Sequence, residues 1–78
     1  MNKGDTVYFA RVNHRVGIYD LCELHVRTVY EKCFVGVDAD SKQAFLISND
    51  DIGEYVFYDR FSALEVLQRE ENNKGDDL

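Results

Sequence analysis

The alternation of apolar and polar residues between positions 19 and 37 is the feature that most restricts the fold. Cys22, Leu24 and Val26 occupy every second position, and each is followed by a polar residue, namely glutamate, histidine and arginine. Successive side chains of a β-strand point to opposite faces of a sheet, so this period of two predicts a strand with one buried face. We expect it over about residues 20–30, followed by a turn at Glu31-Lys32 and a strand over residues 33–37.

Turn-forming residues divide the rest of the first 58 positions. Asn, Asp or Gly occurs in each of three breaks, at residues 13–17, 38–42 and 49–53, and the last can form one turn of 3₁₀ helix. Aromatic, β-branched and aliphatic residues are concentrated between them, which is typical of strands. We therefore expect three more strands, over residues 6–12, 43–48 and 54–58.

The periodicity changes after residue 58. Ala63, Val66 and Leu67 lie at i, i+3 and i+4, and form a narrow apolar stripe of a helix. Asp59 as the capping residue predicts a helix over about residues 60–71, whereas a capping box at Ser62 would start it later. A helix of this length is unstable alone and must pack on the sheet.

These elements predict an α+β fold that is mainly β. We expect either a small SH3-like five-stranded barrel or a bent antiparallel sheet, with one C-terminal helix. A single domain over residues 1–71 and a disordered acidic tail over residues 72–78 are expected. Gly36 inside a strand indicates a bulge or a bend. Neighbouring aromatics such as Tyr8 and Phe9 cannot share a face, so one of them is exposed unless the helix covers it.

Size, cysteine content and termini indicate the cellular setting. The chain has 78 residues, two cysteines and no apolar run long enough to span a membrane. Its first residues lack the apolar region of a secretory signal. We expect free thiols, no membrane association and a cytoplasmic location.

Charge is divided unevenly along the chain. Residues 1–37 carry five basic and four acidic side chains, whereas residues 38–78 carry four basic and eleven acidic ones. Phosphate binding needs concentrated Lys and Arg, so we expect no binding of free nucleic acid by the second half. An acidic surface can simply keep a protein soluble. The sharper hypothesis is that it binds a protein with a basic surface.

One set of residues is similar to a known group of proteins. Asp51-Ile52-Gly53, Val56-Phe57 and the helix that follows resemble small proteins encoded by bacteriophages and mobile elements of Gram-positive bacteria. Gly4-Asp5 and the strand after it resemble their opening. The chain departs from them at Phe61 and Ser62, where such helices usually carry glutamate. The resemblance implies a bacterial host cytoplasm and no particular activity.

Catalytic and metal-binding patterns are weak. Cys22 and His25 have ligand-like spacing, and His14 and Cys33 are the other candidate zinc ligands, but Cys22 and His25 point to opposite faces of one strand. Neither thiol lies in a setting that lowers its pKa, so we expect Cys22 and Cys33 to be core residues. A calcium loop beginning at Asp38 lacks its glycine and final glutamate. We expect no metal, no cofactor and no enzymatic activity.

We therefore predict a protein-binding module, specifically an inhibitor of a host defence protein of the anti-CRISPR kind. Its acidic surface would compete with nucleic acid for a basic channel. The predicted partner-binding residues lie in turns of the acidic half: Asp38, Asp40, Asp50, Asp51, Glu54 and Tyr55.

Two other functions stay open. One is a structural protein that forms a homodimer through a strand edge or the helix. The other is a nucleic-acid module of the SH3-like kind that uses basic residues of the first half, namely Arg11, Arg15, Arg27 and Lys32.

Overall fold

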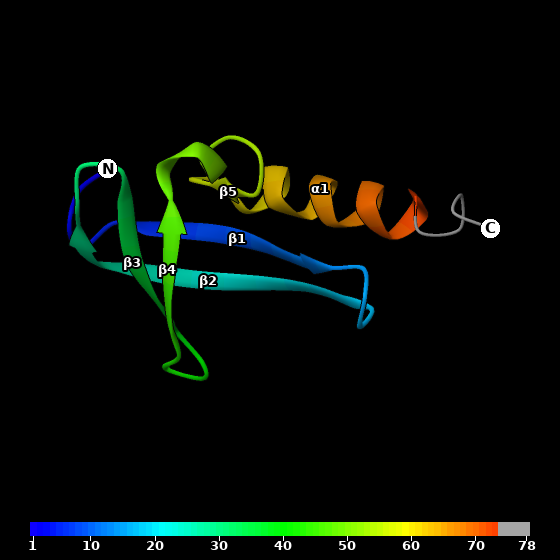
Figure 1. Ribbon diagram of the computed structural model, residues 1–78, viewed down its shortest axis with the longest axis horizontal. Helices are drawn as coiled ribbons and strands as arrows, with labels where there is room; N and C mark the ends of the chain where they lie inside the picture. The colour runs from blue at the N-terminus through cyan, green and yellow to red at the C-terminus, as the bar shows by residue number, and fades with distance from the viewer. Residues whose placement is uncertain (74–78) are drawn as a thin grey trace.

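The computed structural model describes residues 1–73 and contains one five-stranded antiparallel sheet and one α-helix (Figure 1). The strands follow the order β4-β3-β2-β1-β5 across the sheet. In chain order the elements are β1 (Thr6–Asn13), β2 (Ile18–Val29), β3 (Cys33–Asp38), β4 (Ala44–Ser48), the 3₁₀ turn η1 (Asn49–Asp51), β5 (Val56–Phe57) and α1 (Arg60–Asn73). The expected fold class is confirmed. Of the tail predicted over residues 72–78, the first two residues belong to α1, so that part of the prediction is wrong, and residues 74–78 lie outside the described residues.

The sheet is bent but not closed. Phe9 of β1 and Phe45 of β4 belong to strands that are not neighbours, yet their ring centroids are 5.8 Å apart. Neighbouring strands are about 4.8 Å apart, so a flat sheet would hold β1 and β4 roughly 14 Å apart. The sheet therefore curls until its inner faces meet. β4 and β5 stay unpaired with each other, so the bent sheet describes the fold and the closed barrel does not.

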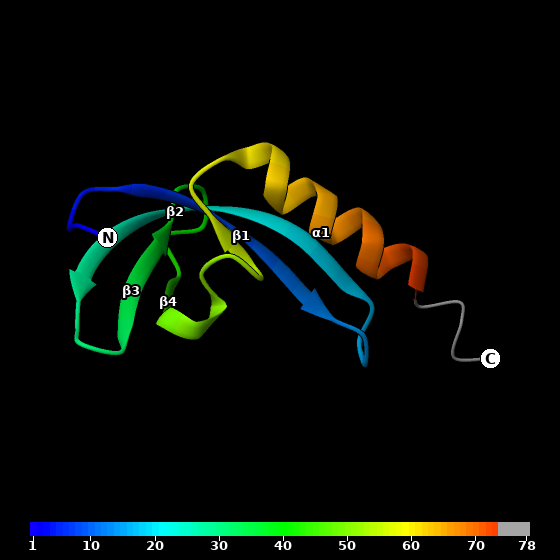
Figure 2. The ribbon, with the colours of Figure 1, turned by 90° about the horizontal axis from the view of Figure 1, so that it is seen from above.

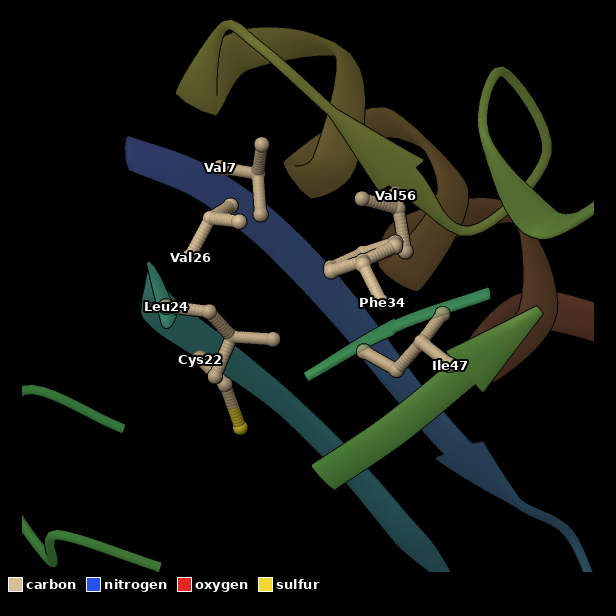
Figure 3. Close-up of a cluster of buried hydrophobic side chains, with 7 residues drawn as sticks. All are labelled: Val7, Cys22, Leu24, Val26, Phe34, Ile47 and Val56. Carbon is tan, nitrogen blue, oxygen red and sulfur yellow. The ribbon is translucent and has the colours of Figure 1, made fainter. Parts of the chain in front are cut away.

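The inner cluster fills the concave face of the curl. Its seven buried side chains come from all five strands (Figure 3): Val7, Cys22, Leu24, Val26, Phe34, Ile47 and Val56. The apolar residues of the alternation in β2 thus face inward as predicted, with Cys22 buried, while His25 is exposed. Burying a large aliphatic or aromatic side chain contributes about 1.5–3 kcal/mol, so this cluster is a main source of stability.

Helix α1 covers the opposite face of β1 and β2 (Figure 2). Ala63, Val66 and Leu67 pack against Ala10 of β1 to form the helix cluster. The aromatic pairs are divided between the two faces, because Tyr8 and Phe57 pack around the helix cluster while Phe9 packs on the inner cluster. Tyr58 is 53% exposed.

The start of α1 is set by Asp59. Its carboxylate oxygen Oδ2 accepts a hydrogen bond from the backbone N–H of Ser62 at 2.8 Å. This bond lowers the pKa of Asp59 from its usual value. The predicted cap at Asp59 is confirmed, and the later start at Ser62 is not formed. The helix continues to Asn73, two residues beyond its predicted end. Among residues 1–73, no helix has the length and apolar character needed to cross a bilayer.

One predicted strand is longer than the strand that forms. The fifth strand is only Val56–Phe57, because the backbone N–H groups of Glu54 and Tyr55 both donate to the carbonyl of Asp51 and close a turn instead. The predicted turn at Glu31-Lys32 is confirmed, and it is stabilised by hydrogen bonds from Asn49. The Asn49 side chain donates to the Glu31 carbonyl at 3.1 Å, and its backbone N–H donates to the Lys32 carbonyl at 2.9 Å.

Gly36 packs closely against Leu24 of β2. A Cβ atom at this position would approach two side-chain carbons of Leu24 at 3.0 Å. The register irregularity of the sheet lies instead in β2, between Val26 and Thr28. Gly36 therefore serves close packing rather than a bulge of its own.

We expect Gly36→Ala to destabilise the fold by about 1–3 kcal/mol, the usual effect of overpacking a tight core. Urea unfolding followed by circular dichroism measures this as a lower midpoint. Gln43→Ala, at an exposed position, is the control and should leave the midpoint unchanged. An unchanged midpoint for Gly36→Ala would contradict the packing described.

Candidate binding surface

The predicted acidic residues divide into two groups at opposite ends of β4. Asp38 and Asp40 lie in the β3–β4 turn, and Asp50 and Asp51 lie in η1 at the other end of the strand (Figure 1). Five residues of strand span about 17 Å. The structure therefore does not bring the four aspartates together into one site.

Asp38 is occupied in building its own turn. Its Oδ1 atom accepts hydrogen bonds from the backbone N–H groups of Asp40 and Ser41, at 2.8 and 2.9 Å. These bonds lower the pKa of Asp38. Lys42 completes the turn with a positive φ of 66° and an ammonium group that donates to the Ala39 carbonyl at 2.8 Å. Asp38 is thus a structural carboxylate.

Asp50, Asp51 and Glu54 form what we call the acidic segment. The short loop from η1 to β5 carries all three, and none of them forms an ion pair within residues 1–73. The backbone of Asp51 accepts the bonds that close the loop, so its shape does not depend on the carboxylates. The three carboxylates therefore remain available to interact with a positively charged partner.

The acidic segment borders two hollows. Asp50 and Glu31 line a shallow hollow where η1 meets the β2–β3 turn. On its other side, a groove of about 630 Å³ lies between the loop and α1, and is lined by Gly53, Glu54, Tyr55, Phe57, Ser62, Glu65, Val66 and Arg69. Glu31 and Glu65 thus lie beside the acidic segment, and the same two hollows are also lined by the cations Lys32 and Arg69.

Tyr55 is the predicted residue that lies deepest in this region. Its ring is half-buried against the helix cluster. Burial, followed by the charges of Glu70 and Glu54, raises the pKa of the Tyr55 phenol above its usual value. The phenol oxygen donates to Glu70 at 3.5 Å, a long hydrogen bond. Tyr55 therefore joins the groove to α1 and acts mainly as a support.

Sequence reasoning missed the role of His14. Its Nδ1 atom lies 2.8 Å from the Tyr19 hydroxyl, and its Nε2 atom lies 3.2 Å from the carboxylate of Glu70. Glu70 is only 17% exposed and also lies near Arg69. His14 thereby ties the tip of the β1–β2 hairpin to the end of α1. Only the separation of 56 positions along the chain conceals this contact from sequence analysis.

The basic residues of the first half do not form one surface. Arg15 lies in the β1–β2 turn, at the opposite end of the hairpin from Lys32. Arg11 extends over the ring of Phe45, 5.7 Å from its centroid, and Arg27 lies near Tyr30 on the convex side. No continuous basic patch joins the four residues of the nucleic-acid hypothesis.

The two cysteines differ in environment. Cys22 is buried in the inner cluster, as predicted, but Cys33 is half-buried and points to the convex face. Its neighbour Phe34 takes the core position, so the expectation of a buried Cys33 is wrong. Within residues 1–73, no three His, Cys, Asp or Glu side chains converge to hold a metal ion.

Burial, and then the nearby carboxylate of Asp38, raise the pKa of the Cys22 thiol to about 11 from 9.0. A thiol reacts as its thiolate, so both the burial and the raised pKa of Cys22 make its thiol less reactive.

Comparison with known protein families, with curated proteins and with solved structures finds no match.

We expect a thiol reagent at pH 8 to label Cys33 quickly in the folded protein and Cys22 only after unfolding. The variant Cys33→Ser should therefore lack the fast phase, and Cys22→Ser should keep it. Mass spectrometry of timed samples measures both. Fast labelling of folded Cys33→Ser would contradict the burial of Cys22.

The raised pKa also predicts a pH effect on stability. Between about pH 9 and pH 11 the unfolded chain loses the Cys22 proton while the folded chain keeps it. Protonation in this window favours the folded state, so the free energy of unfolding falls as pH rises through it. The fall should be smaller in Cys22→Ser, measured by urea unfolding against wild type at each pH.

Proposed function

We propose that this protein is a non-enzymatic binding module, and that its acidic segment contacts a basic surface of another protein. The observation that carries the proposal is the arrangement of Asp50, Asp51 and Glu54 on one short loop, without ion-pair partners in residues 1–73. A carboxylate already paired would have to exchange one partner for another. When these three carboxylates bind a partner, they lose only bound water.

The proposal narrows the set of partner-binding residues. Asp38 supports its own turn, and Asp40 lies beside it, at the far end of β4 from the acidic segment. Tyr55 supports the groove beside Glu54. We therefore assign the contact to Asp50, Asp51 and Glu54, with Glu31 and Glu65 at its margins.

The more specific proposal concerns the class of partner. A loop with several carboxylates presents negative charges to a channel that normally holds phosphates. Complementary charge speeds association and makes it sensitive to salt. Together with the resemblance to proteins of mobile elements, this favours an inhibitor that competes with nucleic acid for a host defence protein.

The test compares two variants that remove charge at opposite ends of β4. Asp50→Asn/Asp51→Asn/Glu54→Gln neutralises the acidic segment, and Asp38→Asn/Asp40→Asn removes charge at the other end while retaining an acceptor in the turn. Each tagged protein is used to capture proteins from a bacterial lysate. We expect the first variant to lose at least tenfold of any protein that wild type captures, and the second to retain it.

Two further measurements test the mechanism on the captured protein once purified. Raising the salt from low to moderate concentration should weaken the complex, and a short DNA or RNA duplex should displace the wild-type chain. Equal capture by both variants, or an affinity that does not change with salt, would overturn the proposal.

A further inference from the structure

Strand β4 forms an open edge of the sheet. It pairs with β3 on one side, and within residues 1–73 no strand pairs with its other side. Ala44, Leu46 and Ser48 are exposed, and Leu46 at 71% is the most exposed large hydrophobic side chain described. Figure 1 shows β4 running directly into η1.

The backbone of these residues points away from the sheet. The carbonyl of Gln43 accepts from the N–H of Asp38 at one end of the β3–β4 ladder, and the N–H of Asn49 donates to Lys32 at the other. In an antiparallel pair such bonded positions alternate, so Phe45 and Ile47 bond to β3. The N–H and C=O groups of Ala44, Leu46 and Ser48 therefore point outward.

The usual protections of an edge strand are missing from β4. Natural sheets block open edges with charged side chains, proline or bulges. The sequence of β4, Ala-Phe-Leu-Ile-Ser, contains none of the first two, and its register with β3 is regular. This edge is therefore suited to pair with another strand.

The sequence around Leu46 is complementary to itself. In an antiparallel pair centred on this residue, Leu46 meets Leu46 of a second copy, and Ala44 meets Ser48. Phe45 meets Ile47 on the inner face, so both inner clusters are extended. All three outward-pointing residues fall in the hydrogen-bonded positions of that register. A register shifted by one residue would put Leu46 opposite Phe45 or Ile47 of the second copy, whose side chains lie on the other face of the sheet.

The charges next to β4 select the antiparallel orientation. Lys42 precedes the strand by two residues, and Asp50 follows it by two. Antiparallel pairing centred on Leu46 brings Lys42 of one copy and Asp50 of the other to the same end of the paired edges, in the turns that flank the strands. Parallel pairing would instead set like charges against each other.

We propose that two copies of this chain pair through β4, in antiparallel orientation with Leu46 opposite Leu46, to form a continuous ten-stranded sheet. A pair of five-residue edges buries less than the roughly 1,200 Å² of a stable interface, so the dimer is weak and forms as the protein concentration rises. Of the acidic segment, only Asp50 lies at the ends of this interface, so the dimer does not rest on the proposed function.

Disulfide trapping tests the register. In a Cys33→Ser background, Leu46→Cys should form a disulfide-linked dimer at least tenfold faster than Val16→Cys, a cysteine of similar exposure in the β1–β2 turn. Facing residues of a bonded pair have Cα atoms about 5.5 Å apart, within the range of a disulfide. Ala44→Cys mixed with Ser48→Cys should give the mixed dimer, and each of these alone should not. Equal rates at positions 46 and 16, or Ala44→Cys linking to itself, would overturn the proposal.

A charge at the centre of the edge tests the association in solution. Leu46→Lys should remain a monomer at concentrations where wild type dimerises, as measured by sedimentation velocity. The control is Phe61→Lys, because Phe61 on α1 is 70% exposed and should leave the dimer intact. A wild type that stays monomeric at millimolar concentration, or a dimer lost only in Phe61→Lys, would refute the pairing. Neither variant alters the acidic segment, so the capture experiment is unaffected.

Discussion

The pairing of β1 with β2 is the interaction on which the rest of the structure depends. Eight residue pairs join these strands in regular antiparallel register, and both faces of the ladder are apolar. A sheet with two apolar faces needs cover on each side. The chain supplies it in two ways, by curling β3 and β4 around one face and by placing α1 on the other. A chain of 78 residues thus obtains two small clusters rather than one large core.

Much of this arrangement can be predicted from local patterns. The alternation around Leu24 gives the strand and its buried face, and Asp59 gives the helix start, because both depend on neighbours a few positions away. The curl cannot be predicted in this way, since it rests on contacts such as Phe9 with Phe45, 36 positions apart. The sequence places Cys33 in the core, which is wrong for the same reason. Its face depends on the turn that Asn49 holds from outside.

The candidate site shows the same limit. Composition identifies an acidic half of the chain, but β4 separates its aspartates into two groups with different tasks. Asp38 uses its charge within its own turn, where it also helps to keep the Cys22 thiol protonated. Asp50, Asp51 and Glu54 have no such internal task. A partner-binding surface can be inferred from carboxylates only when those that form hydrogen bonds within the fold, such as Asp38, are excluded.

The position of α1 has a consequence for how the chain is made. The helix is synthesised after all five strands, yet it covers the face of β1 and β2 that carries Tyr8, Ala10 and Leu21. Until it emerges, that apolar face is exposed to water, and the outer side of β4 has no strand beside it among residues 1–73. Exposed apolar surface and unpaired edges make folding intermediates prone to aggregate. The nascent chain is therefore most prone to aggregate after the five strands have emerged and before α1 has emerged, and slower translation of the α1 segment would prolong this interval.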